Sequence, residues 1–408
     1  MGDPTAGAAH GASPGVSPVG GRLRVVLARG AVPDVGAARE VVERALTTSG
    51  VPGELVTSAG PAEIASAVRW SAGDPADDAA DEPAGEPTTA EVVLVLPADA
   101  PDVADLRLPE GAAILRVDLG DRAPDRSPGV RRHVRGRGPR GFADAVTAWS
   151  VHRSHPATVH RYGPHPDQRA DLRVPPGPPP PDGYPVAVLV HGGYWRSRWE
   201  SDLMEPMAAD LVDRGWATWN VEYRRPDGHG WDATTADVAA ALDALAGVAR
   251  ARADVDLARV VTIGHSAGGQ LVARLAADVA ADPAAPVRPA LTVSLAGVLD
   301  LVAGDRHGLG DGAVAAALGG RADAVPAAYA ASSPAARLPV GLPVAVVCGL
   351  ADDPHLLAMA RGFVRAATAA GDDVLAVEDD GDHFAVIDPR SAIWGRVAEL
   401  VTARVTGP

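Results

Sequence analysis

Cysteine and the large aromatic side chains are scarce in this sequence. Cys348 is the single cysteine among 408 residues, which excludes an internal disulfide and a zinc site built from paired cysteines. A chain without disulfides is typical of a reducing compartment, so we expect a cytoplasmic protein. Only three Phe, five Tyr and four Met occur, and alanine and valine dominate the apolar residues instead.

Long hydrophobic runs and an excess of positive charge are also absent. No apolar run approaches the about 20 residues of a membrane-spanning helix, so the sequence predicts a soluble globular protein. The formal net charge of −15 repels nucleic acid and anionic membranes, so neither is an expected partner. Residues 1–21 lack the basic and apolar regions of a signal peptide, and their Gly, Ala, Ser and Pro content predicts a disordered tail.

The length of 408 residues favours two domains, and strands alternate with helices in the first, at residues 22–150. This alternation predicts a small flavodoxin-like α/β domain with a doubly wound parallel sheet. An acidic segment rich in Pro and Gly at 71–90 predicts a flexible surface insertion. The expected strands are 22–29, 53–57, 90–98 and 111–120, and the expected helices are 37–50, 61–70 and 141–149.

The order of these elements resembles the type II 3-dehydroquinate dehydratases, a family of flavodoxin-like lyases. Asp118 in RVDLGD (116–121) occupies the place of that family's catalytic histidine. LPADAPD (96–102) lacks the family's asparagine, and no tyrosine precedes Tyr162. The resemblance implies a degenerate copy that serves as a structural, binding or dimerisation module, through which the chain can form a homo-oligomer. Retained dehydratase activity is the alternative.

The second domain, at residues 151–408, begins with a segment rich in proline and histidine. PPGPPPP (175–181) predicts a loop between edge strands, because proline interrupts helices and central strands. Four histidines lie between 152 and 165, but their spacing suits no single face and no carboxylate or cysteine set accompanies them. We therefore expect solvated or packing roles rather than a metal site. From residue 184 onward, strand–helix alternation predicts one mostly parallel sheet whose ligands bind beyond the carboxyl ends of the strands.

One short motif in this domain combines a buried strand, a tight turn and a helix. VVTIGHSAGGQL (260–271) contains G-x-S-x-G, with Ser266 between glycines. Glycines are needed in such a turn because side chains would strike the neighbouring strand and helix. The turn exposes the serine hydroxyl above the sheet, where the helix N-terminus favours developing negative charge. The pattern indicates a nucleophile, and a simple helix N-cap is the alternative.

A serine nucleophile requires a base and an acid, in the chain order Ser, acid, His for this kind of sheet. Asp352 and Asp353 follow one apolar strand, and His383 follows the next. Either aspartate can orient the base while the other caps the helix that begins near Pro354. His355 shares the turn of the two aspartates, so His383 is the better base.

The segment HGGYW (191–195) follows an earlier strand and predicts an oxyanion hole. Gly192 and Gly193 allow the backbone to approach a substrate oxygen, and the N–H of Ala267 is the expected second donor. Tyr194 and Trp195 form an aromatic wall for the substrate, or Trp195 packs the loop onto the sheet. His191 is expected to be a structural partner within the loop.

These segments together resemble the α/β-hydrolases and, among them, the kynurenine formamidase (arylformamidase) group. HGGYW, GHSAGG (264–269), GLADDPHL (349–356) and DHF (382–384) match that family's motifs within residues 158–405. The resemblance selects Asp352 as the acid. It implies a Ser266–His383–Asp352 hydrolase that acts on a small-molecule formamide through an acyl-enzyme, without a metal or organic cofactor. A carboxylesterase for short acyl esters is the alternative.

Overall fold

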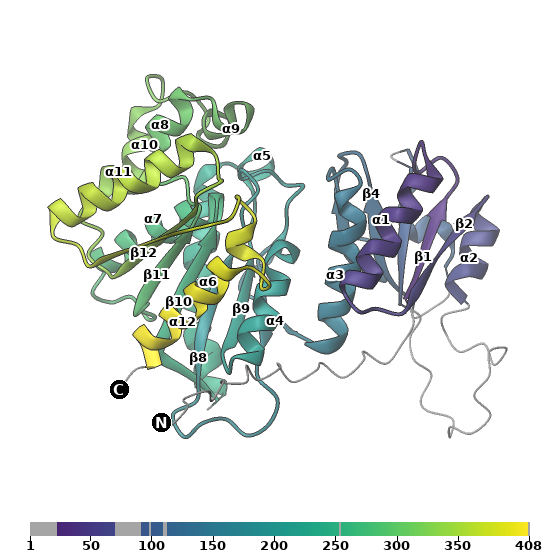
Figure 1. Cartoon of the computed structure of the whole chain (residues 1–408), viewed down its shortest axis with the longest axis horizontal. Coiled ribbons are helices and arrows are strands. Elements are labelled where there is room, and N and C mark those ends of the chain that lie inside the picture. The colour runs from purple at the N-terminus through teal and green to yellow at the C-terminus, as the bar shows by residue number, and fades with distance from the viewer. Residues whose placement is uncertain (1–22, 70–90, 98, 109–111, 253, 407–408) are drawn as a thin grey trace, which may run out of the picture. The chain divides into compact units, whose positions relative to one another are not determined.

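The computed structural model describes residues 23–69, 91–97, 99–108, 112–252 and 254–406. The expected tail at 1–21 and the expected insertion at 71–90 lie outside the described residues. The chain divides into two compact units (Figure 1). The first contains residues 1–119, 123–133 and 139–154, and the second contains residues 120–122, 134–138 and 155–408.

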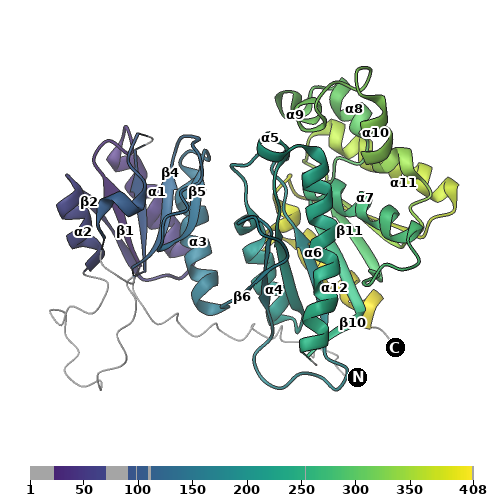
Figure 2. The ribbon, with the colours of Figure 1, turned by 180° about the vertical axis from the view of Figure 1, so that it is seen from behind.

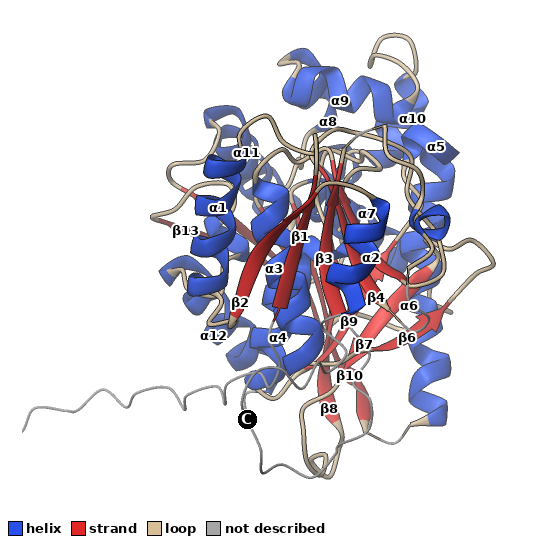
Figure 3. Ribbon diagram, turned by 90° about the vertical axis from the view of Figure 1, so that its right-hand side faces the viewer, coloured by secondary structure: helices blue, strands red, loops and turns tan. Residues whose placement is uncertain are grey.

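The first unit is built on a five-stranded sheet in the order β2-β1-β3-β4-β5. This is the flavodoxin-like order, and β1 pairs in parallel with β2 and β3, as β3 does with β4. Helices α1 and α3 pack together on one face, and α2 covers the other (Figure 3). The elements are β1 (Leu23–Ala28), α1 (Val35–Thr48), β2 (Gly53–Ser58), α2 (Pro61–Arg69), β3 (Glu91–Leu96), β4 (Ala113–Asp118), β5 (Val130–Arg135) and α3 (Arg140–Ser154).

A buried polar network lies at the carboxyl end of β4. Arg116 donates to Asp118 at 2.8 Å and to Asp125 at 2.6 Å, and His133 of β5 contacts Asp118 through Nε2. Burial alone would raise the pKa of Asp118, but the hydrogen bonds from His133 and Arg116 outweigh it and hold that pKa below its usual value. Asp118 is therefore an ionised group engaged in hydrogen bonds inside the core.

The second unit contains an eight-stranded sheet in the order β13-β12-β11-β10-β8-β9-β7-β6. Strands β8 to β13 pair in parallel, while β7 is antiparallel to both β9 and β6. The strands are β6 (Thr158–Arg161), β7 (Arg169–Arg173), β8 (Tyr184–Val190), β9 (Ala217–Glu222), β10 (Val255–His265), β11 (Leu291–Leu295), β12 (Val344–Gly349) and β13 (Val374–Asp379). The proline-rich loop leads from β7 into β8, a central strand, so the expectation of an edge strand after it is wrong.

Helices cover both faces of this sheet, because consecutive residues of its buried strands point to opposite sides. On β8, Val186, Val188 and Val190 face α6 (Trp231–Ala251), α7 (Ala267–Ala281) and α11 (Pro354–Ala370). Ala187 and Leu189 face α4 (Glu205–Asp213) and α12 (Ala392–Thr406). Figure 1 shows α4 and α12 on the near side of the sheet, and Figure 2 shows α6 from behind.

A group of short helices gathers beyond the carboxyl ends of the strands. We call it the cap segment: α8 (Leu301–Arg306), α9 (Leu309–Leu318) and α10 (Pro326–Ser332), at the top of Figure 1. Gly308, Gly310, Asp311 and Gly312 all adopt positive φ at the start of α9. The sequence analysis did not predict these helices, and the segment that forms them is rich in Ala and Gly.

No described helix combines the length and the apolar character that crossing a bilayer requires.

Candidate active site

Ser266 stands at the junction of β10 and α7, with its backbone in an unusual conformation. Its φ of 53° and ψ of −115° lie in a region that residues with a Cβ rarely adopt. The Ser266 N–H donates to the carbonyl of Leu295 in the neighbouring strand β11 at 2.8 Å, which holds the turn against the sheet. A strained turn of this kind between strand and helix is the geometry of a nucleophile elbow.

The glycines around Ser266 are required by close backbone approaches. A Cβ on Gly264 would lie 2.1 Å from the carbonyl oxygen of Gly268, and a Cβ on Gly268 would lie 2.1 Å from that of Val190. Real Cβ atoms do not approach backbone this closely, so neither position can hold another residue without moving the turn. The steric reason predicted from the motif therefore has a direct counterpart in the structure.

The loop after β8 lies directly against the elbow. A Cβ on Gly192 would be 2.9 Å from the Cβ of Ser266, and a Cβ on Gly193, at φ 111°, would be 2.3 Å from the ring of Trp199. This closeness places the backbone of the expected oxyanion loop beside Ser266 and the first residue of α7, Ala267. The loop continues through Tyr194 and Trp195 with φ of 52° and 56°.

His191 has a structural position at the start of this loop. It is fully buried, its Nδ1–H donates to the Gly192 carbonyl at 2.8 Å, and its ring stacks on Tyr223 with centroids 4.4 Å apart. The Tyr223 hydroxyl donates to the His191 carbonyl at 2.9 Å. Burial, and then the charge of Arg225, lowers the pKa of His191 to about 3, so its imidazole stays neutral.

Asp352 and His383 form a hydrogen-bonded pair across neighbouring strand ends. Nδ1 of His383 lies 3.0 Å from both carboxylate oxygens of Asp352, whose side chain is only 1% exposed. Asp353 instead caps α11, because its Oδ1 accepts the N–H of His355 at 2.7 Å. The two adjacent aspartates thus divide the two tasks that the residues alone left open between them.

His265 connects the serine turn with the segment that carries His383. Its Nε2–H donates to the backbone carbonyl of His383 at 2.9 Å, and the two imidazole rings have centroids 4.8 Å apart. No hydrogen bond joins the Ser266 hydroxyl to the His383 ring, although the structure describes both residues. Catalytic hydrogen bonds are often long before substrate binds, so this arrangement is compatible with a serine–histidine pair.

A cavity of about 300 Å³ opens on the side of His383. Tyr194 reaches it from the loop after β8, while Ser266 is 2% exposed and is not among its lining residues. The lining consists of Tyr194, Ala351, Asp352, Asp353, Leu356, Asp382, His383 and Phe384. Tyr194 is therefore placed to touch a ligand in this cavity.

Trp195 has a packing position instead. It is 2% exposed, its Nε1–H donates to Oε1 of Gln270 at 3.2 Å, and its ring meets Trp231 edge-on with centroids 5.8 Å apart. Gln270 also donates to the carbonyl of Ser332 at 2.9 Å, and Trp231 donates to the Ser332 hydroxyl at 2.7 Å. Gln270 therefore links the expected oxyanion loop and the cap segment to α7, a role that the sequence did not reveal.

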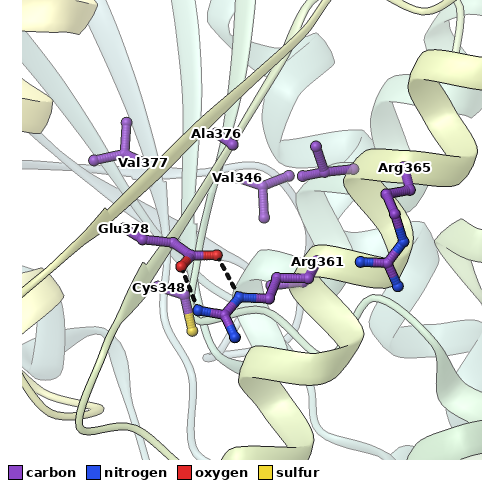
Figure 4. A pocket seen from close by; sticks show the side chains of 9 residues that line it. Val346, Cys348, Arg361, Arg365, Ala376, Val377 and Glu378 are labelled. Carbon is purple, nitrogen blue, oxygen red and sulfur yellow. Dashed lines mark hydrogen bonds and ion pairs between the residues drawn. The ribbon is translucent and has the colours of Figure 1, made fainter.

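Cys348 lies at the end of β12, behind the loop of Asp352. Its Sγ is 3.9 Å from Oδ2 of Asp352, and burial, followed by the nearby carboxylates, raises the pKa of its thiol to about 12. A second cavity of about 190 Å³ lies beside it between α11 and the strands β12 and β13. Figure 4 shows Arg361 of α11 bonded to Glu378 of β13 next to the sulfur, at 2.8 and 2.6 Å.

The histidines before β7 have separate neighbours. His155 contacts Asp213 at 3.0 Å, and the ring of His160 lies 5.4 Å from that of Trp219. His165, Asp167 and His229 are the described group that could hold a metal ion, with ligand atoms within 4.8 Å of one another. Two of the three side chains, His165 and Asp167, have hydrogen-bond partners of their own.

In that group, Nδ1 of His165 accepts the N–H of Asp167 at 3.1 Å. The carboxylate of Asp167 lies 3.3 Å from Arg225. A guanidinium group this close opposes a second cation.

Comparisons with known proteins agree with this architecture. The BD-FAE family model matches residues 171–338. No curated protein sequence matches the chain. A predicted thioesterase from Silicibacter sp. tm1040 is similar in structure, with 26% identity and a TM-score of 0.51 over 64% of this chain and 91% of that one.

Two further solved structures share the fold at lower identity. Esterase B from Lactobacillus rhamnosis HN001 is 18% identical, with a TM-score of 0.53 over 61% of this chain and 84% of that one. A bacterial heroin esterase is 19% identical, with a TM-score of 0.51 over 62% and 84%. The second unit has the α/β-hydrolase fold, and the protein is a hydrolase of that type.

Proposed function

We propose that the second unit is a serine esterase that cleaves small carboxylic esters through an acyl-enzyme on Ser266. The observation that carries this proposal is the buried Asp352 bonded to His383, beside a strained serine turn whose His265 contacts the same histidine segment. The names of the structural neighbours, which include esterases, support an ester rather than another acyl substrate.

In this mechanism the hydroxyl of Ser266 attacks the ester carbonyl and passes its proton to Nε2 of His383. Asp352 accepts the Nδ1–H, which orients the imidazole and stabilises its charged form. The backbone N–H groups of Gly192, Gly193 and Ala267 receive the oxyanion. His383 then protonates the leaving alcohol, and a water molecule deprotonated by the same imidazole releases the acid.

Hydrolysis of a formamide is the second candidate, because HGGYW and GHSAGG match motifs of the kynurenine formamidases. The same triad serves both reactions, so the leaving group decides between them. Comparing N-formylkynurenine with p-nitrophenyl acetate as substrates separates the candidates. A higher kcat/KM for the formamide would favour the second.

Active-site labelling tests the proposed nucleophile. A fluorophosphonate ester should add to Ser266, as located by peptide mass spectrometry, and Ser266→Ala should lose about 10⁶-fold in kcat. His383→Ala should also inactivate, whereas His355→Ala, an exposed histidine on the nearby helix, should retain activity. Activity that survives in Ser266→Ala would refute the proposed nucleophile.

A further inference from the structure

The cavity beside His383 has an uneven distribution of charge. Three of its eight lining residues are aspartates, and none is an arginine. The sequence contains no lysine at all, so arginine and histidine are the only side-chain cations available to the chain. The cavity therefore presents carboxylates, one imidazole and apolar or phenolic groups to a ligand.

Only one of these carboxylates is engaged with the proposed catalytic base. Asp352 is bonded to His383, whereas Asp353 and Asp382 are exposed and form no ion pair among the described residues. Both accept backbone N–H groups instead, Asp353 from His355 and Asp382 from Phe384 and Ala385. These bonds hold the two carboxylates in place, and no cation faces them among the described residues.

The surroundings of Tyr194 also carry negative charge. After burial, the charges of Asp353 and Asp352 are the largest causes that raise the pKa of its hydroxyl. Arg196 acts in the opposite direction and donates to the carbonyl of Gly310 at 2.6 Å. Asp311, the residue after Gly310, raises the pKa of the Tyr194 hydroxyl and so opposes Arg196. Arg196 therefore does not make the surroundings of Tyr194 positive.

The chemistry of the base determines which part of an ester enters this cavity. His383 uses Nδ1 for Asp352, so Nε2 is the nitrogen that delivers the proton to the leaving oxygen. The alcohol part of the substrate is attached to that oxygen and extends on the side of the imidazole. Asp353, Asp382 and Tyr194 line the cavity that His383 itself borders.

We propose that this cavity receives the alcohol part of the ester and selects cationic or uncharged alcohols over anionic ones. The inference rests on the proposed esterase function, which it refines by naming the substrate class. A negatively charged alcohol would approach two carboxylates without a facing cation, whereas a cationic alcohol would be attracted by both.

Three acetate esters of similar shape test the proposal. Acetylcholine carries a positive charge, 3,3-dimethylbutyl acetate is its uncharged counterpart, and 3-acetoxypropanoate carries a carboxylate at the corresponding place. We expect kcat/KM, measured by acetate release at low salt, to be at least about tenfold higher for the cationic than for the anionic ester. Salt of about 0.5 M should reduce this ratio, since it screens exposed charges.

Matched variants connect the preference to the cavity. Asn at 353 and 382 keeps an oxygen for the backbone N–H groups, so Asp353→Asn/Asp382→Asn should fold normally, as thermal unfolding can check. The double variant should bring the cationic-to-anionic ratio close to one. Asp373→Asn removes one carboxylate, which is paired with Arg404, before the amino end of β13, at the opposite end of the strand, and should leave the ratio unchanged.

The outcomes separate this inference from the proposed function. Absence of any Ser266-dependent hydrolysis refutes the esterase and the charge preference together. Ser266-dependent hydrolysis in which the anionic ester equals or exceeds the cationic one refutes the charge preference alone. An unchanged ratio in the double variant also refutes it, because the two carboxylates would then not be its cause.

Discussion

Replacing Gln270 with leucine removes both hydrogen bonds that this buried amide makes. Gln270 is 0% exposed. Its loss would leave without a partner the Trp195 indole N–H, now bonded at 3.2 Å, and the Ser332 carbonyl, now bonded at 2.9 Å. An unsatisfied buried group costs about 1–3 kcal/mol, so we expect a loss of roughly 2–4 kcal/mol in unfolding free energy. For a unit of this size that lowers Tm by about 5–15 °C.

The same variant should also slow catalysis, because Trp195 anchors the loop that contains Gly192 and Gly193. Loss of one oxyanion donor costs about 10²–10³-fold in kcat, so a loosened loop should cost about 10–100-fold, with a smaller change in KM. Steady-state kinetics with p-nitrophenyl acetate and calorimetry on the same preparations measure both effects.

Trp231→Phe is the matched control for Gln270→Leu. It removes one hydrogen bond to Ser332 from the same network, but it keeps both hydrogen bonds of Gln270 and an aromatic ring against Trp195. We expect it to lower Tm and to leave kcat within about threefold of wild type. If Gln270→Leu lost stability and kept its kcat, Gln270 would be a purely structural residue. If it lost neither, the network would not exist in solution.

Three further changes test other parts of the site. Gly192→Ala places a Cβ 2.9 Å from that of Ser266, so its kcat should fall about 10²-fold. The control Gly215→Ala, whose Cβ meets no atom within 4 Å, should keep its kcat, and equal losses in the two variants would contradict this reasoning. Burial lowers the pKa of His191 to about 3, against about 6.5 in the unfolded chain, so the free energy of unfolding should decrease as the pH falls from about 6.5 to about 3. In urea titrations His191→Asn should weaken this pH dependence, and an unaltered dependence would contradict the assigned role of His191. Because burial raises the pKa of Cys348 to about 12, a disulfide reagent at pH about 8 should label it only after unfolding, and rapid labelling of the native protein would show an accessible thiolate.

The elements that the sequence predicted are those whose signals are local. Strand–helix alternation and the tight glycine turn around Ser266 depend on residues a few positions apart. The sequence analysis did not predict β5, because the signal for this strand is not local. Its sequence VRRHVR has no apolar alternation, because His133 points to a buried polar network rather than to an apolar core. The sequence of β5 alone does not show that His133 pairs with Asp118 of β4.

Side-chain roles that depend on distant partners were not predictable. Asp352 and Asp353 are neighbours of the same type, and apart from the family resemblance only the position of His383, 31 residues further along, distinguishes them. Gln270 is 75 residues from Trp195 and 62 from Ser332, so neither hydrogen bond leaves a pattern in the chain. A glutamine among apolar residues on a buried helix is a weak signal that it has a specific partner.

His265, the residue before Ser266, makes a contact that the five-residue motif does not indicate. His265 is 1% exposed, and its bond to the His383 carbonyl joins the end of β10 to the segment after β13, across the two intervening strands β11 and β12. Since the backbone of Ser266 is fixed by its strained turn, this bond holds the histidine segment relative to the nucleophile. The second position of G-x-S-x-G is therefore bonded here to the histidine of the proposed triad, so the proposed alignment of Ser266 with His383 depends on His265 as well.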